Sequence, residues 1–327
     1  MMSMIQGYWV SQIVRTVADL RIPEHLRAGP LAAQDIATKE ASDPIGTFRL
    51  MRAAASLGLV SYNSSNATYA GTPLLETLRE GAHNSLRELA LALTAPGHWL
   101  PWGNLTRAIR EGQAQTQETL GADIFTYLGG HPDEGGLFSA AMTNLSSPVI
   151  REAVPLIDMQ GVHTVVDVGG ANGAFVLELL AANPTLHGIL FDLPHVIPGA
   201  ESEAKQRGLF DRISCVAGDF FDNLPAGDLY LLKFILHDWD DSACTEILNN
   251  CRRAMNPGGR IVVLDILLPG VGEPGVGTLM DMNMLALCPG QERDLAEFDR
   301  LFASAGLRRT NATLVQSPYH ALEVVAS

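Results

Sequence analysis

From residue 164 onward, short apolar runs alternate with segments of helical periodicity, and this alternation constrains the fold more than any other feature. The first apolar run, 164–168, predicts a strand, and 174–182 predicts the helix that follows it. Alternating strands and helices are typical of an α/β domain with a parallel sheet. We expect a closing strand pair within 308–326 and the parallel strands at 164–168, 188–191, 213–216, 229–235 and 261–264.

The first 90 residues show a different pattern, of short helices. Helical spacing of apolar residues predicts a helix within 47–60, preceded by a shorter one at 30–41. Residues 61–69 predict a small hairpin. Two helices and a hairpin form the outline of a winged helix, which serves either DNA binding or dimerisation. Arg49 and Arg52 are the only cations on the second helix, and this favours dimerisation.

Net charge and composition exclude several classes of protein. The formal charge is −14 over 327 residues, so the surface repels nucleic acid and anionic membranes. No apolar run approaches the ~20 residues of a membrane span, and residues 1–6 lack the build of a signal peptide. We expect a cytoplasmic protein with reduced thiols, because no metal-ligand spacing links Cys215, Cys244, Cys251 and Cys288.

A glycine-rich turn, Asp167-Val168-Gly169-Gly170-Ala171-Asn172-Gly173, follows the first predicted strand. Glycine at such a turn lets a ligand approach the backbone. The spacing fails the G-x-G-x-x-G of nicotinamide-dependent dehydrogenases. It fits the D-x-G-x-G-x-G of class I S-adenosylmethionine (SAM)-dependent methyltransferases, with Ala171 at the middle glycine.

Two further strand ends carry chemistry that suits a nucleoside. Asp192 ends the second strand, where a carboxylate can accept hydrogen bonds from both ribose hydroxyls. Asp219 and Phe220 follow the third strand and could bracket an adenine. An ordinary α/β turn is the alternative for each feature, and three successive strand ends together favour a cofactor site.

The apolar run 229–235 ends at a histidine among carboxylates, Leu236-His237-Asp238-Trp239-Asp240-Asp241. Strand ends present the chemistry of an open α/β sheet, and histidine moves protons near neutral pH. Asp265 ends the fifth strand as His237 ends the fourth, and paired strands lie ~4.8 Å apart. The pattern favours His237 as a catalytic base oriented by Asp265. The alternatives are a structural histidine and a loop-capping aspartate.

Together with later motifs, these segments make the chain resemble the caffeic-acid-type small-molecule O-methyltransferases of plants and their bacterial relatives in natural-product pathways. The likeness covers nearly the whole chain. The later motifs are Gly218-Asp219-Phe220, Asn256-Pro257-Gly258-Gly259, Asp281-Met282-Asn283-Met284-Leu285, Gly290-Gln291-Glu292-Arg293 and Glu297-Phe298.

The resemblance implies a winged-helix-like dimerisation domain at 1–90 and a methyltransferase domain at 91–327. Within the latter, a helical substrate-side segment at 91–160 precedes a Rossmann-like core at 161–327. It also implies a homodimer formed through the N-terminal domain and SAM as the methyl donor. We expect no metal ion, because a histidine base makes one unnecessary.

Residue roles are implied as well. His237 matches the general base, and Asp265 and Glu292 match the carboxylates that flank and orient it. Donor-holding positions match Gly169, Asp192, Asp219, Phe220 and Lys233. Substrate-side positions match Met142, Asn144, Asp238 and Met284. Ala171 departs from a usual glycine, and Asp265 is one methylene shorter than the glutamate common in plant members.

The leading hypothesis is methyl transfer to a hydroxyl of a small aromatic, phenolic or polyketide-like metabolite. An N-methyltransferase, or a SAM-binding enzyme that does not methylate, is the alternative, followed by a winged-helix ligand-sensing regulator. Asp238, Asp240 and Asp241 could hold Mg²⁺, but carboxylates at a helix start are more often caps, so we interpret Asp240 and Asp241 as caps.

Overall fold

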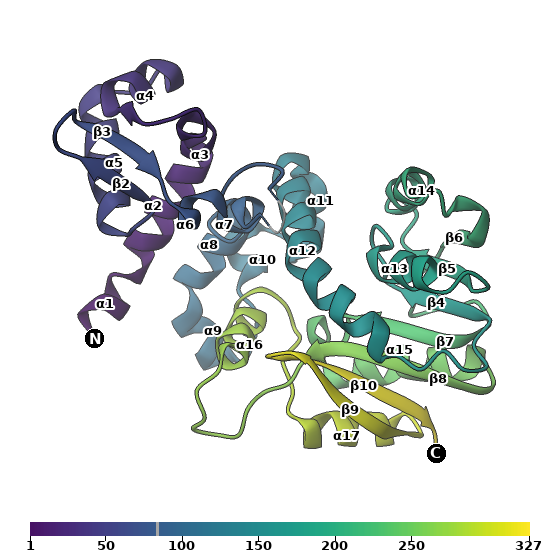
Figure 1. Cartoon of the computed structure of the whole chain (residues 1–327). Helices are drawn as coiled ribbons and strands as arrows, with labels where there is room; N and C mark the ends of the chain where they lie inside the picture. The colour runs from purple at the N-terminus through teal and green to yellow at the C-terminus, as the bar shows by residue number, and fades with distance from the viewer. Residues whose placement is uncertain (83–84) are drawn as a thin grey trace. The chain divides into compact units, whose positions relative to one another are not determined.

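The computed structural model describes residues 1–82 and 85–327, which divide into two compact units (Figure 1). The first unit comprises 1–103 and 124–146, and the second comprises 104–123 and 147–327. One boundary between them falls inside the long helix α12 (Pro132–Ala153). Among the described residues, no helix combines the length and apolarity required to cross a membrane.

The first unit is mainly helical and carries a small antiparallel sheet of order β1-β3-β2. The predicted hairpin is confirmed as β2 and β3, in which Tyr62 faces Tyr69. Besides α12, its elements are α1 (Met2–Ile5), α2 (Gly7–Asp19), α3 (Ile22–Leu26), β1 (Leu31–Ala32), α4 (Ala33–Glu40), α5 (Pro44–Ser56), β2 (Val60–Asn63), β3 (Thr68–Gly71), α6 (Pro73–Glu76), α7 (Arg87–Ala92), α8 (Pro96–Gly103) and α11 (Ile124–Gly130).

The helix expected within 47–60 begins and ends earlier than predicted. Asp43 caps α5 by accepting a 2.7 Å hydrogen bond from the Gly46 N–H, and Pro44 takes the first helical position, where its fixed φ costs nothing. The helix ends at Ser56, and Val60 is already paired in β2. The prediction missed the cap because it followed apolar spacing alone.

The second unit contains the predicted parallel sheet, confirmed with seven strands in the order β6-β5-β4-β7-β8-β10-β9. The five strands β6, β5, β4, β7 and β8 run parallel to one another, and β10 pairs antiparallel with both β8 and β9. Its elements are α9 (Leu105–Glu111), α10 (Thr116–Leu120), η1 (Val154–Leu156), β4 (Thr164–Val168), α13 (Ala174–Ala182), β5 (His187–Asp192), α14 (Ile197–Gln206), η2 (Phe210–Arg212), β6 (Ile213–Ala217), β7 (Gly227–Lys233), η3 (Leu236–Asp238), α15 (Asp241–Ala254), β8 (Met255–Ile266), α16 (Val276–Leu287), α17 (Leu295–Ser304), β9 (Leu307–Gln316) and β10 (Tyr319–Ala326).

Strand β7 shows how the sheet is held between two layers of helices. Leu229 and Leu231 pack on one face against α13, α14 and the end of α12. Tyr230 and Leu232 pack on the other face against α15 and α17. All four are fully buried, and each buried Leu side chain contributes about 1.5–3 kcal/mol. Burial on both faces explains the continuous apolar run.

Two strand boundaries differ from the sequence prediction. Strand β7 stops at Lys233 because Phe234 adopts a left-handed conformation, with φ +56°. Strand β8 begins at Met255, so the Asn256–Gly259 segment belongs to a strand, although we expected it to end the preceding helix. That helix, α15, ends at Ala254. Met255 pairs with Gly227 and Arg260 pairs with Leu229, and the register shifts between these two pairs, so residues 256–259 form an irregularity within the strand that a glycine-rich turn signal does not reveal.

Candidate active site

The histidine turn, residues 236–239, connects β7 to α15. Phe234 turns the chain out of the strand, and η3 (Leu236–Asp238) carries His237. The next helix starts at once, because Asp240 accepts a 2.9 Å hydrogen bond from the Ala243 N–H. The turn is thus fixed at both ends, by the sheet and by a capped helix.

Three chain segments meet at the imidazole of His237. Its Nδ1 lies 3.0 Å from Glu292 Oε1 and 3.4 Å from Asp265 Oδ1. Asp265 lies on β8, the strand paired with β7, and Glu292 lies between α16 and α17. The Nε2 lies 3.6 Å from Asp238 Oδ1, beyond normal hydrogen-bond length. The side chains of Asp265 and Glu292 are almost fully buried, whereas His237 keeps 15% of its side-chain surface.

This arrangement favours a positively charged imidazole. Burial lowers the pKa of His237, but Asp265, Asp238 and Glu292 attract the charged form more strongly and raise the pKa to about 10. Burial raises the pKa of Asp265 and of Glu292, and His237 opposes both rises. A proton is therefore held tightly within this cluster.

The same three side chains could also hold a metal ion. One donor atom each from His237, Asp265 and Glu292 lies within 4.8 Å of the others. The aspartates weighed for Mg²⁺ have other partners. Asp240 caps α15 as predicted, but our interpretation of Asp241 as a cap is wrong: it is the first helical residue and pairs with Arg293 at 2.8 Å.

The glycine loop, residues 169–173, lies at the end of β4, next to β7. Gly169 has a φ of +67°, and a Cβ there would lie 2.6 Å from Ile235 Cδ1. Ala171 has a φ of +53°, unusual for a residue with a side chain. Asp192, at the end of β5, accepts a 2.8 Å hydrogen bond from the Ala171 N–H. A carboxylate and a backbone turn therefore face each other at this sheet edge.

Three more predicted donor positions lie at the same edge. Asp219 is exposed and accepts a 2.9 Å hydrogen bond from the Phe221 N–H. The ring of Phe220 makes an edge-to-face contact with Trp239 of the histidine turn. Lys233 ends β7, with Nζ 4.8 Å from the centre of the Phe234 ring. Burial lowers the pKa of Lys233, while Asp167 and Asp265 oppose that change.

Two family models match this chain. Residues 102–308 match the model of the O-methyltransferase domain, and residues 2–81 match the O-methyltransferase dimerisation domain. The chain belongs to the O-methyltransferase family. The resemblance noted in the sequence and the assignment to this enzyme class are confirmed, and the dimerisation domain supports a homodimer.

Known relatives are similar to this O-methyltransferase along almost its full length. The phenazine O-methyltransferase PhzM of Lysobacter antibioticus is 34% identical over 94% of this chain and 89% of its own. The solved mitomycin 7-O-methyltransferase is 31% identical, with a TM-score of 0.94 over 99% and 96% of the two chains. An O-methyltransferase from neocarzinostatin biosynthesis, solved with SAM and 2-hydroxy-5-methyl naphthoic acid, is 31% identical, with a TM-score of 0.85 over 97% and 96%.

The predicted substrate-side residues of the O-methyltransferase belong to both units. Met142 and Asn144 lie on α12 in the first unit, where Asn144 donates a 3.1 Å hydrogen bond to Glu88 Oε2. Asp238 and Met284 belong to the second unit, where Asp238 lies beside His237 and Met284 is buried on α16. Burial raises the pKa of Asp238, and His237 opposes this.

Sequence reasoning missed two residues that contact the histidine turn. Gly290 lies directly against the His237 carbonyl, and Arg293 is almost completely buried beneath the turn. Both belong to a motif that carried the family resemblance, but neither was assigned a role. Because Arg293 is basic, no apolar periodicity in the sequence indicates that it is buried. Only its position next to Glu292 could have drawn attention to it.

Proposed function

We propose that this enzyme transfers a methyl group from SAM to a hydroxyl of a small aromatic secondary metabolite, with His237 as general base and with Asp265 and Glu292 orienting it. The observation that carries the proposal is the contact of one imidazole nitrogen, His237 Nδ1, with two buried carboxylates from different segments. This leaves Nε2 as the nitrogen for an acceptor.

The chemistry requires a base and an alignment. A phenol is a weak nucleophile, with a pKa near ~10 by analogy with tyrosine. When neutral, His237 can donate Nδ1–H to Glu292 and present the Nε2 lone pair to the acceptor hydroxyl. As it takes that proton, Asp265 and Glu292 stabilise the imidazolium, as the carboxylate does in a catalytic triad. Bound SAM supplies a methyl group on a positively charged sulfur.

Positions at the neighbouring strand ends suit such a donor. Asp192 offers a carboxylate for ribose hydroxyls, and Asp219 and Phe220 could bracket the adenine, as the sequence predicts. Gly169 adopts a positive φ in the loop and leaves no room for a Cβ beside Ile235, and Lys233 adds a cation at the end of β7. The neocarzinostatin relative, solved with SAM, supports this choice of donor.

The acceptor is proposed to contact Met142, Asn144, Asp238 and Met284, within a cytoplasmic homodimer. The named relatives act in phenazine, mitomycin and neocarzinostatin chemistry, which supports an aromatic natural-product acceptor. No metal ion is required in this account, because a histidine base already removes the acceptor proton.

Product analysis tests the proposal. The protein is incubated with methyl-labelled SAM and two matched acceptor panels, one of phenols and one of the corresponding anilines. We expect S-adenosylhomocysteine and a labelled methyl ether from the phenols only. Labelled N-methyl products from the anilines alone would contradict O-methylation and support the N-methyltransferase alternative.

A further inference from the structure

The strap, residues 290–293, lies between α16 and α17 and contacts the backbone of the histidine turn. A Cβ on Gly290 would lie 1.8 Å from the His237 carbonyl oxygen and 2.4 Å from the Asp238 carbonyl carbon. Both atoms belong to the backbone and cannot move aside as a flexible side chain can. Only glycine therefore allows the strap to lie this close to the base.

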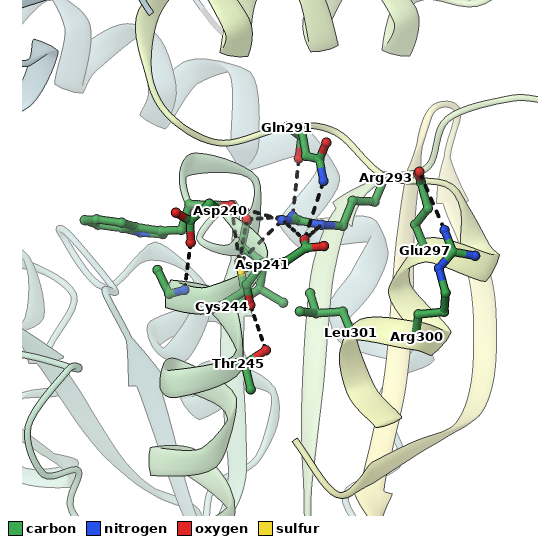
Figure 2. A network of polar contacts seen from close by, with 12 residues as sticks. Asp240, Asp241, Cys244, Thr245, Gln291, Arg293, Glu297, Arg300 and Leu301 are labelled. Carbon is green, nitrogen blue, oxygen red and sulfur yellow. Dashed lines mark hydrogen bonds and ion pairs between the residues drawn. The ribbon is translucent and has the colours of Figure 1, made fainter. Parts of the chain in front are cut away.

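The side chain of Arg293 reaches from the strap to both ends of the histidine turn, and Figure 2 shows it beside Asp241. Its Nη1 donates a 2.9 Å hydrogen bond to the Leu236 carbonyl, and its Nη2 donates a 3.0 Å hydrogen bond to the Trp239 carbonyl. These two residues flank His237 and Asp238 in the sequence. One planar guanidinium thus sets the distance between the two ends of the turn.

Arg293 is itself held by charge and by its backbone. Its Nε and Nη2 donate to Asp241 Oδ1 at 3.0 and 2.8 Å, which provides a partner for a guanidinium that is 1% exposed. Its carbonyl accepts a 3.0 Å hydrogen bond from the Leu268 N–H, just beyond β8. Arg293 therefore contacts the end of β8 through its backbone carbonyl, and the histidine turn and the start of α15 through its side chain.

We propose that Arg293 is a positioning residue for the base. By holding the Leu236 and Trp239 carbonyls, it fixes the position of the His237 imidazole relative to the Glu292 carboxylate. The inference rests on the proposed function. Glu292 and Arg293 are consecutive residues, so one strap residue contacts the imidazole and the next holds the backbone that carries it. A shift of the turn would lengthen the Nδ1–Glu292 contact.

The test compares Arg293→Lys and Asp241→Asn with Arg300→Gln. A lysine keeps the charge but cannot hold both carbonyls and Asp241 with a planar fork. The Asp241 side chain is 68% exposed, so its amide variant should fold even if the arginine variant does not. Arg300 lies on α17, has an exposed side chain and pairs with Glu297, and it provides the control (Figure 2).

For both test variants we expect kcat to fall about 10- to 100-fold, the effect of misplacing a reacting group by around 1 Å, with the dissociation constant for SAM unchanged. We also expect the pKa of His237, followed by histidine NMR, to fall, because the Glu292 contact weakens. The control should change neither quantity.

A folded Asp241→Asn protein with wild-type kcat and an unchanged His237 titration would overturn the positioning role, whatever its thermal stability. Failure of the proposed function is a separate result, since the wild-type protein would then show no turnover. The NMR titration needs no turnover, so it still decides the question about Arg293 in that case.

Discussion

The histidine turn and the glycine loop follow neighbouring parallel strands, β7 and β4, but they are built in opposite ways. The histidine turn is held by charged side chains from distant segments, Asp265, Glu292 and Arg293. The glycine loop relies on backbone conformation, with Gly169 and Ala171 at positive φ. One region is arranged to hold a proton at a fixed place, and the other to let a ligand approach the backbone.

If this contrast is correct, Asp192→Ala should damage donor binding far more than chemistry. A charge-assisted hydrogen bond contributes about 1.5–3 kcal/mol, so the dissociation constant for SAM should rise about 10- to 100-fold. Turnover at saturating SAM should be largely retained. Calorimetry with SAM and initial rates measure the two quantities, and Asp211→Asn, at an exposed site, is the matched control. Equal losses in SAM affinity and in turnover would contradict the assignment of donor binding to one region and of catalysis to the other.

Glu292→Gln should affect the histidine turn rather than the glycine loop. Removing one of the carboxylates that raise the pKa of His237 lowers that pKa from about 10. In the wild type, kcat/KM for the donor should rise with pH up to about pH 10, where His237 loses its proton. In the variant this limb should move to lower pH, while the maximal kcat falls about 10-fold because the imidazolium is less stabilised. A pH profile measures both effects, with Glu273→Gln as control. If the rising part of the pH profile does not move in the variant, His237 is not the titrating base.

Ala171→Gly tests the backbone side of the comparison. The left-handed conformation costs a residue with a Cβ roughly 1–2 kcal/mol, and the extra freedom of glycine in the unfolded chain offsets about 0.4–1 kcal/mol of the relief. We expect a small gain in the free energy of unfolding, measured by urea denaturation, with SAM affinity retained. Ala41→Gly, at a φ of +50° in the first unit, should behave similarly. A marked loss of stability would show that the Ala171 methyl group makes contacts that outweigh the strain.

Metal removal should have the smallest effect. His237, Asp265 and Glu292 could bind a metal ion, but the proposed chemistry uses the imidazole itself. After dialysis against EDTA, turnover should be unchanged, and added Mg²⁺ should not increase it. If EDTA abolishes activity and Mg²⁺ or Zn²⁺ restores it, a metal ion rather than the histidine base activates the acceptor.

The same contrast explains how much could be predicted from the sequence. The glycine loop is contiguous, so its residues and its place after a strand were evident, and Asp265 followed from its position on a neighbouring strand. Glu292 was assigned only through the family resemblance. Arg293 was missed and Asp241 misinterpreted, because their pairing joins residues 52 positions apart and neither has a local pattern that reveals it.

The most direct test measures kcat and the dissociation constant for SAM on the same preparation of His237→Ala. His163→Ala, at an exposed residue directly before β4, is the control. The account predicts a fall in kcat of about 10²- to 10⁴-fold, the usual contribution of a general base, with SAM affinity unchanged. Full turnover of the phenolic acceptor by the His237→Ala protein would contradict the central claim.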